Sequence, residues 1–187
     1  MEALLVSLST VAIAEMGDRT QLLALILSAR FQRPWPIVAG ILIATVINHL
    51  LAALIGAHLG QLLTPRRIDL AVAISMLLMS AWSLRPDTLD ETTESTASRG
   101  AFVTTLITFF IAEIGDKTQI ATMALAAAYP ALTLVIAGST SGMLIANVPV
   151  VFLGKAFAGR LPLRAIRQIT AIVFLLLALT FTRRAYL

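Results

Sequence analysis

The stretch IAEMGDRTQ, residues 13–21, sets two carboxylates and a guanidinium inside an apolar run that extends from residue 3 to residue 29. On insertion scales, a single Asp, Lys or Arg at the centre of a membrane helix costs about 2.5 to 3.5 kcal/mol. Such groups are expected to face one another or water, because facing lipid is too costly. The stretch therefore predicts a functional site in the middle of a bundle of membrane helices.

The composition is typical of a membrane protein. Of the 187 residues, 58% are hydrophobic and 13% are charged, and the mean hydropathy is +0.90. A soluble domain of this size needs much more charged surface. The apolar runs lack the alternation of barrel strands, so the sequence predicts an all-α polytopic membrane protein with six transmembrane helices. Each run approaches the roughly 20 residues that a spanning helix needs; the runs are 3–29, 35–58, 68–84, 101–128, 131–154 and 164–182.

The charge pattern and the cysteine count exclude several classes of function. The formal net charge is +4, yet the Lys and Arg residues form short clusters between the apolar runs. That distribution is typical of membrane topology signals, and it offers no basic face with interleaved aromatic residues for nucleic acid. The chain has no cysteine, which excludes disulfides, thiolate metal sites and cysteine nucleophiles. Membrane lipid is the expected surrounding partner, and the oligomeric state stays open.

The opening motif occurs a second time. IAEIGDKTQ, residues 111–119, matches residues 13–21 at seven of nine positions, and it lies 98 residues further along the chain. Other residues match at the same offset, so the similarity is not confined to the motif. These matches are Ala39-Gly40 with Ala137-Gly138, and Gly56 with Gly154.

The repeat predicts the domain organisation. Two three-helix repeats, 1–84 and 101–187, are joined by an acidic, Thr- and Ser-rich linker, 85–100. Because each repeat has an odd number of helices, the second enters the membrane from the opposite side. The sequence thus predicts an inverted-topology repeat, the architecture of many secondary transporters.

Basic residues predict the orientation of the chain. Eight Lys and Arg residues lie in the loops after the first, third and fifth apolar runs, and four lie on the other side. By the positive-inside rule the first set is cytoplasmic, which makes the linker cytoplasmic and places both termini outside the cytoplasm. We expect a multi-pass protein of the inner (plasma) membrane. The eight are Arg30, Arg33, Arg85, Arg99, Lys155, Arg160, Arg164 and Arg167; the four are Arg66, Arg67, Arg183 and Arg184.

Both motifs fall near the centre of their apolar runs, where inverted-repeat transporters bind their ions. In helical register the Glu and Asp of each motif are i, i+3 neighbours, and a Gln follows three residues later. The motif glycines allow close backbone approach or a break in the helix. The predicted metal ligands are Glu15, Asp18, Gln21, Glu113, Asp116 and Gln119; the predicted supporting residues are Gly17, Arg19, Thr20, Asn48, Gly115, Lys117 and Thr118.

The charges of the two motifs suggest an exchange of cations. Four carboxylates against Arg19 and Lys117 leave two negative charges when all are ionised. One divalent cation or two protons neutralise them equally, which is what an exchanger of metal for protons requires. A purely structural alternative pairs Glu15 with Arg19 and Glu113 with Lys117, each at i, i+4 spacing, but it accounts for only two of the carboxylates.

The available ligand atoms are mostly oxygens. Carboxylates, amides and hydroxyls suit hard divalent ions such as Ca²⁺, Mn²⁺ or Mg²⁺, and they do not suit Cu⁺ or structural Zn²⁺. Asn48, His49 and Asn147 are possible further ligands, although hydrogen bonds between helices explain them equally well. The sequence interpretation of the methionines is packing; these are Met16, Met76, Met79, Met123 and Met143.

With these paired motifs the chain resembles a family of cation/proton antiporters. The family is marked by one E-x-G-D-[KR]-[TS] motif in each three-helix half, here at residues 15–20 and 113–118. It includes Golgi, chloroplast and bacterial manganese or calcium transporters within the lysine-exporter-like superfamily, and this chain resembles the bacterial members. The resemblance implies a secondary transporter that exports Mn²⁺, Ca²⁺ or both in exchange for protons, with the four motif carboxylates as ligands.

Two rival functions remain open at this point. An amino-acid exporter of the same superfamily needs a cation for the substrate carboxylate, and both motif cations already have acidic neighbours. An intramembrane aspartyl protease would use Asp18 and Asp116, but such enzymes carry G-x-G-D, and here Glu15 and Glu113 replace the first glycine. A shared proton between two aspartates is also disfavoured beside Arg19 and Lys117. We therefore expect no enzymatic activity and no cofactor besides the transported cation and the coupling proton.

Overall fold

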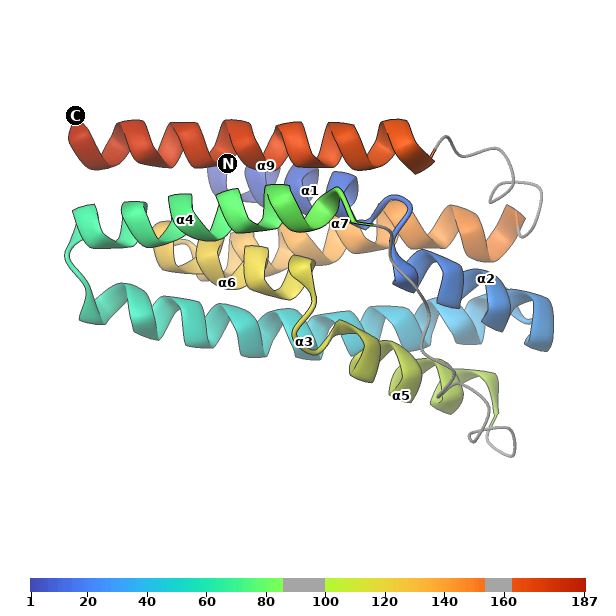
Figure 1. Ribbon diagram of the computed structural model, residues 1–187. Coiled ribbons are helices and arrows are strands. Elements are labelled where there is room, and N and C mark those ends of the chain that lie inside the picture. The colour runs from blue at the N-terminus through green and yellow to red at the C-terminus, as the bar shows by residue number, and fades with distance from the viewer. Residues whose placement is uncertain (86–99, 154–162) are drawn as a thin grey trace.

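The computed structural model describes residues 1–85, 100–153 and 163–187 of the chain (Figure 1). Its described part is helical, with no strand in those residues, so the predicted all-α class is confirmed. The acidic linker lies almost wholly outside the described residues, as do Gly154, Lys155 and Arg160. The helices are α1 (Glu2–Glu15), α2 (Arg19–Phe31), α3 (Pro34–Leu62), α4 (Pro65–Ser83), α5 (Ala101–Glu113), α6 (Lys117–Ala128), α7 (Leu132–Leu153) and α9 (Leu163–Tyr186).

Neither motif-bearing run is one continuous helix. The run 3–29 is divided into α1 and α2, and the run 101–128 into α5 and α6. Gly17 and Gly115 sit in the two breaks, each with φ of 73°, a left-handed conformation that side chains other than glycine's disfavour. The sequence left open whether these glycines serve close approach or a break; the structure shows a break.

The helices after each break begin at equivalent positions. α2 begins at Arg19 and α6 at Lys117, 98 residues apart, which is the offset of the two sequence motifs. The starts of α3 and α7 differ by the same 98 residues, and so do those of α4 and α9. The two halves of the chain therefore repeat the starts of these helices as well as their motifs.

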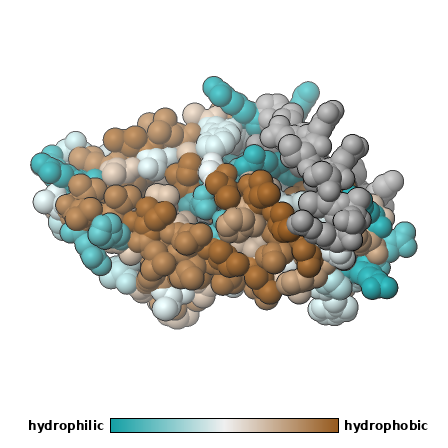
Figure 2. Space-filling model, turned by 90° about the horizontal axis from the view of Figure 1, so that it is seen from below, coloured by the Kyte–Doolittle hydropathy of each residue, from teal (hydrophilic) through white to brown (hydrophobic). Residues whose placement is uncertain are grey.

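Three described helices are long and apolar enough to cross a membrane by length and composition. They are α3, α7 and residues Arg164–Tyr186 of α9. Many large apolar side chains on these helices and on α4 are exposed, such as Ile55, Ile74 and Leu176. Figure 2 shows hydrophobic side chains over the middle of one face, with hydrophilic ones mostly toward the two ends. Such a surface is suited to lipid, because in water a patch of this extent promotes association.

The helices of the two halves are interleaved. α1 and α2 lie against α7, while α5 and α6 lie against α3, so each broken pair contacts the long helix of the other half. α4 and α9 pack together beside them (Figure 1). One apolar cluster is formed mainly by α1, α4, α6 and α9, together with Ala53 of α3 and Val135 of α7, and a second is formed by α2, α3, α5 and α7. Each break therefore separates a helix of one cluster from a helix of the other, which leaves the motifs between the two clusters.

Glycine allows the long helices to approach their neighbours this closely. A Cβ at Gly56 of α3 would overlap the carbonyl oxygen of Met123 in α6. A Cβ at Gly142 of α7 would lie 2.5 Å from the carbonyl oxygen of Leu8 in α1. Small residues at helix crossings are the usual way for membrane helices to bring their backbones together.

The α3–α6 crossing provides a test of this packing. Gly56→Ala should lower the free energy of unfolding by about 1–3 kcal/mol, because the added methyl group forces the two backbones apart. Thermal unfolding of the purified protein in detergent measures the effect. Gly100→Ser is the matched control, since a Cβ at Gly100 meets nothing within 4 Å. Equal melting temperatures for the two variants would contradict the proposed tight crossing.

Candidate functional site

The two breaks present the same constellation of acidic side chains. In each break a glutamate is the last residue of one helix and an aspartate is the N-cap of the next: Glu15 and Asp18 between α1 and α2, and Glu113 and Asp116 between α5 and α6. All four carboxylates are buried, none with more than 2% of its residue exposed. The aspartates stand at the positive ends of the helices that they cap, where negative charge is stabilised.

Two reciprocal ion pairs join the breaks. Arg19 Nη2 lies 3.1 Å from Asp116 Oδ1, and Lys117 Nζ lies 2.9 Å from Asp18 Oδ1. The Lys117 pair is almost fully buried, while 28% of the Arg19 side chain is exposed. Arg19 Nη2 also donates to the Ala112 carbonyl oxygen at 2.6 Å, at the end of α5. These contacts place the two motifs face to face.

The structure corrects the ion pairing that was considered from the sequence. The i, i+4 pairs of Glu15 with Arg19 and of Glu113 with Lys117 presume a continuous helix through each motif. The breaks end that helical register, and the two cations form their described ion pairs across the repeats. The glutamates make other contacts: Glu15 Oε1 accepts a hydrogen bond from Asn147 Nδ2 at 3.3 Å, and Glu113 Oε2 accepts one from Thr118 Oγ1 at 3.0 Å.

The motif glutamines hydrogen-bond to the backbone at the breaks. Gln21 Oε1 accepts a hydrogen bond from the Gly17 backbone N–H, and Gln119 Oε1 accepts one from the Gly115 N–H, both at 2.8 Å. Their amide nitrogens reach the long helices. Gln21 Nε2 donates to the Ala146 carbonyl oxygen of α7 at 3.0 Å, and Gln119 Nε2 donates to Asn48 Oδ1 of α3 at 3.4 Å.

The remaining predicted residues also lie at the breaks, with unequal contacts. Asn48 Nδ2 donates to the Phe110 carbonyl oxygen at 3.1 Å, which ties α3 to α5. Thr118 is hydrogen-bonded to Glu113, whereas the equivalent hydroxyl of Thr20 is buried without a hydrogen-bond partner in the described structure. Sequence reasoning left Asn147 as one of several possible helpers, although it contacts a motif carboxylate directly. Its only sequence signal is an amide within an apolar run.

The carboxylates are not grouped as metal ligands in the part of the chain that the structure describes. Within residues 1–85, 100–153 and 163–187, no group of three or more His, Asp or Glu side chains is arranged to hold a metal ion. One oxygen of Glu15 and one of Glu113 are buried without a hydrogen-bond partner in this part of the chain. The site therefore offers two glutamate oxygens for a cation, while each aspartate is engaged by a basic side chain from the other repeat.

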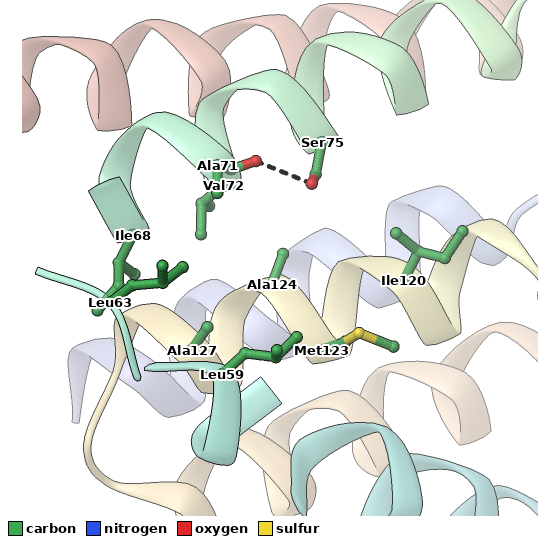
Figure 3. A pocket seen from close by; sticks show the side chains of 10 residues that line it. All are labelled: Leu59, Leu63, Ile68, Ala71, Val72, Ser75, Ile120, Met123, Ala124 and Ala127. Carbon is green, nitrogen blue, oxygen red and sulfur yellow. Dashed lines mark hydrogen bonds between the residues drawn. The ribbon is translucent and has the colours of Figure 1, made fainter. Parts of the chain in front are cut away.

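A separate cavity of about 120 Å³ lies between α3, α4 and α6 (Figure 3). Its lining is apolar except for Ser75, whose hydroxyl donates to the Ala71 carbonyl oxygen of its own helix at 2.9 Å. No motif carboxylate lines it. A cation has no partner in such a cavity, so the candidate ion site is at the breaks.

Comparison with known proteins identifies the family of this chain. Residues 3–91 and 101–187 match the family model described as "Divalent cation/proton antiporter GDT1". The chain belongs to this family. A protein of Vibrio cholerae serotype O1 named "Putative manganese exporter" is 52% identical over 180 residues, covering 96% of this chain and 90% of its own length. A GDT1-like protein of Synechocystis is 30% identical over 199 residues, covering 95% of each chain. No solved structure matches the chain.

Membership of this family confirms the expectation that the protein has no enzymatic activity. The family is one of transporters, so this membrane protein is not an enzyme, and the protease alternative is excluded. The match spans both halves of the chain and both motifs.

The buried ion pair predicts a large effect on stability. Lys117→Met removes the ammonium group opposite the buried Asp18 carboxylate, which should lower the free energy of unfolding by about 3–5 kcal/mol at neutral pH. Thermal unfolding in detergent measures the loss. Arg184→Gln is the control, since the Arg184–Asp69 pair is long, at 3.8 Å, and 47% of the arginine side chain is exposed. That change should cost about 1 kcal/mol or less. A comparable loss in both variants would count against a special role of the buried pair.

Proposed function

We propose that this membrane protein exports Mn²⁺, Ca²⁺ or both from the cytosol in exchange for protons, through a carboxylate site at the middle of the membrane. The observation that carries the proposal is the reciprocal pairing of the two breaks, which gathers four buried carboxylates at the junction of the repeats. The family description, divalent cation/proton antiporter, and the name of the Vibrio cholerae relative support it. The ligands would be Glu15, Asp18, Glu113 and Asp116, with Gln21 and Gln119 beside them.

The proposed architecture is six spans in two inverted repeats, 1–84 and 101–187. The helix starts that repeat at an offset of 98 support it, as does the packing of each broken pair against the other half. In this arrangement α1 with α2, and α5 with α6, each make one broken span. Broken spans of this kind occur in membranes where the irregular backbone lines a site and is shielded from lipid.

The proposed orientation puts both termini outside the cytoplasm, in the inner (plasma) membrane. The helix ends that this orientation places on the outer side of the membrane lie close together in the structure. Tyr129, after α6, donates to Glu2 Oε1 at the start of α1 at 3.0 Å. Arg184, near the end of α9, lies 5.7 Å from the centre of the Tyr129 ring and 3.8 Å from Asp69 Oδ1 near the start of α4.

The charge of the site explains why protons and a divalent ion would exchange. Four carboxylates with two basic side chains have a net charge of minus two when all are ionised. An empty ionised site is costly to move through a low-dielectric region, whereas a site filled by one divalent ion or by two protons is neutral. A site filled by one divalent ion or by two protons could therefore change its exposure from one side of the membrane to the other, whereas the empty, ionised site would resist this change.

An amino-acid exporter fits the structure less well. Its substrate carboxylate needs a cation in the site, and Arg19 and Lys117 are each within 3.1 Å of an aspartate from the other repeat. A substrate carboxylate would have to displace one of these pairs. A divalent cation can begin at the two glutamate oxygens that have no hydrogen-bond partner in the described residues, without displacing either pair.

Removal of single charges tests the metal site. Asp18→Asn and Asp116→Asn keep the size of the side chain and remove one negative charge each. Each should weaken Mn²⁺ binding by at least tenfold, or about 1.4 kcal/mol, because the cluster can no longer neutralise a divalent ion. Titration calorimetry on folded, monodisperse protein is the measurement. Asp69→Asn serves as control, since Asp69 pairs with Arg184 outside the motifs. Wild-type affinity in both motif variants would exclude these residues as ligands.

Proton competition predicts the pH dependence of binding. Carboxylates must be ionised to ligate a metal, so protons and the metal compete for the same oxygens. Mn²⁺ affinity should be high at about pH 8 and should fall steadily toward about pH 5, with protons released when metal binds. Calorimetry in buffers of different ionisation enthalpy counts the released protons. A flat affinity profile with no proton release would argue for a channel or a uniporter instead of an exchanger.

A further inference from the structure

Two residues of α7, Met143 and Asn147, lie one helical turn apart beside the first break. Both are fully buried. A single nitrogen, Asn147 Nδ2, donates to Glu15 Oε1 at 3.3 Å and to the Met143 carbonyl oxygen at 3.1 Å, and it lies 3.2 Å from Met143 Sδ. The thioether sulfur and a motif carboxylate are therefore neighbours of the same amide group.

The crossing of α7 and α1 places these residues there. Gly138 and Gly142, one turn apart on α7, approach the α1 backbone so closely that a Cβ on either would lie within 2.5 Å of a carbonyl oxygen. Because α7 has no side chain at these two positions, it lies close along α1, and its next turns follow α1 toward its end. That end is Glu15, the last residue of α1.

Met143 differs from the other fully buried methionine. Met76 belongs to the apolar cluster formed mainly by α1, α4, α6 and α9. Met143 is equally buried, yet it belongs to neither apolar cluster. Met143 is buried in the core, as its interpretation as packing requires, and its sulfur in addition contacts a polar amide.

The same location has oxygens without donors. Asn147 Oδ1 and Glu15 Oε2 are both buried and have no hydrogen-bond partner in the described part of the chain. Buried acceptors of this kind are uncommon and call for a specific partner. A cation would satisfy both, since carboxylate and amide oxygens are good ligands for divalent ions.

We propose that Met143 and Asn147 complete the ion site around Glu15, and that the thioether selects Mn²⁺ over Ca²⁺ and Mg²⁺. This inference rests on the proposed function. Ca²⁺ and Mg²⁺ take oxygen ligands, so a sulfur in the coordination shell does not compensate them for lost water. Mn²⁺ also prefers oxygen ligands, but as a transition metal ion it loses less affinity than Ca²⁺ or Mg²⁺ does when one ligand of the shell is a thioether. The position equivalent to Met143 in the first repeat is Thr45, so α7 alone supplies this selectivity.

The decisive experiment compares two leucine variants of buried methionines. Met143→Leu keeps the approximate volume and removes the sulfur, and Met76→Leu makes the same change within an apolar cluster. Mn²⁺ and Ca²⁺ affinities are measured by calorimetry on folded protein. We expect Met143→Leu to lower the ratio of Mn²⁺ to Ca²⁺ affinity by about tenfold, or about 1.4 kcal/mol. Met76→Leu should keep the wild-type ratio.

Two results would overturn the inference. The first is a ratio of Mn²⁺ to Ca²⁺ affinity in Met143→Leu that equals the wild-type ratio. The second is a loss of Mn²⁺ and Ca²⁺ affinity that is the same in Met143→Leu and Met76→Leu, because such a loss indicates packing alone. Glu15→Gln distinguishes failure of this inference from failure of the proposed function. The proposed ion site itself is wrong if the wild-type protein binds neither ion, or if Glu15→Gln binds both ions with unchanged affinity. X-ray absorption at the manganese edge of Mn²⁺-loaded wild-type protein should show a sulfur neighbour. A shell of oxygens alone would reject the thioether even if Met143→Leu does not fold.

Discussion

Two ion pairs, Arg19 with Asp116 and Lys117 with Asp18, hold the halves of this molecule together at its middle. A charged group buried alone in a low-dielectric region costs several kcal/mol, so each motif is tolerated only opposite the other. Once the breaks face each other, their helices must continue along the other half. That requirement accounts for the packing of α1 and α2 on α7, and of α5 and α6 on α3.

The breaks bring helix ends to the candidate site. A left-handed glycine lies in each break, and a glutamine side chain accepts from its backbone N–H, so this donor needs no water. Each aspartate caps the positive end of the following helix. The end of α5 in turn offers a carbonyl oxygen to Arg19. A continuous helix would have presented neither end, and its backbone groups would all have been used within the helix.

The repeats share their motifs but differ in the residues around them. Glu113 is held by Thr118 from its own repeat, whereas Glu15 is held by Asn147 from the other. α4 packs on α6, and α9 packs on α1, so the outer pair lies against one end of each broken span. Inverted repeats in transporters exchange such unequal arrangements as the site opens to alternate sides. The unequal contacts are therefore consistent with the proposed exchange function, even though the two motifs are nearly identical.

The sequence by itself determined the helical class and the repetition of the motif, because hydrophobic runs and closely matching motifs are local properties. It left open whether Gly17 and Gly115 break their helices, since glycine is also compatible with close packing of a continuous helix. It could not determine the partners of the charges. Arg19 has Glu15 four residues away, yet its partner is Asp116 in the other half, because the glycine break ends the local register. Nor could it separate Met143 from Met76. The neighbours of a buried sulfur depend on where α7 crosses α1, and only the tertiary structure sets that crossing.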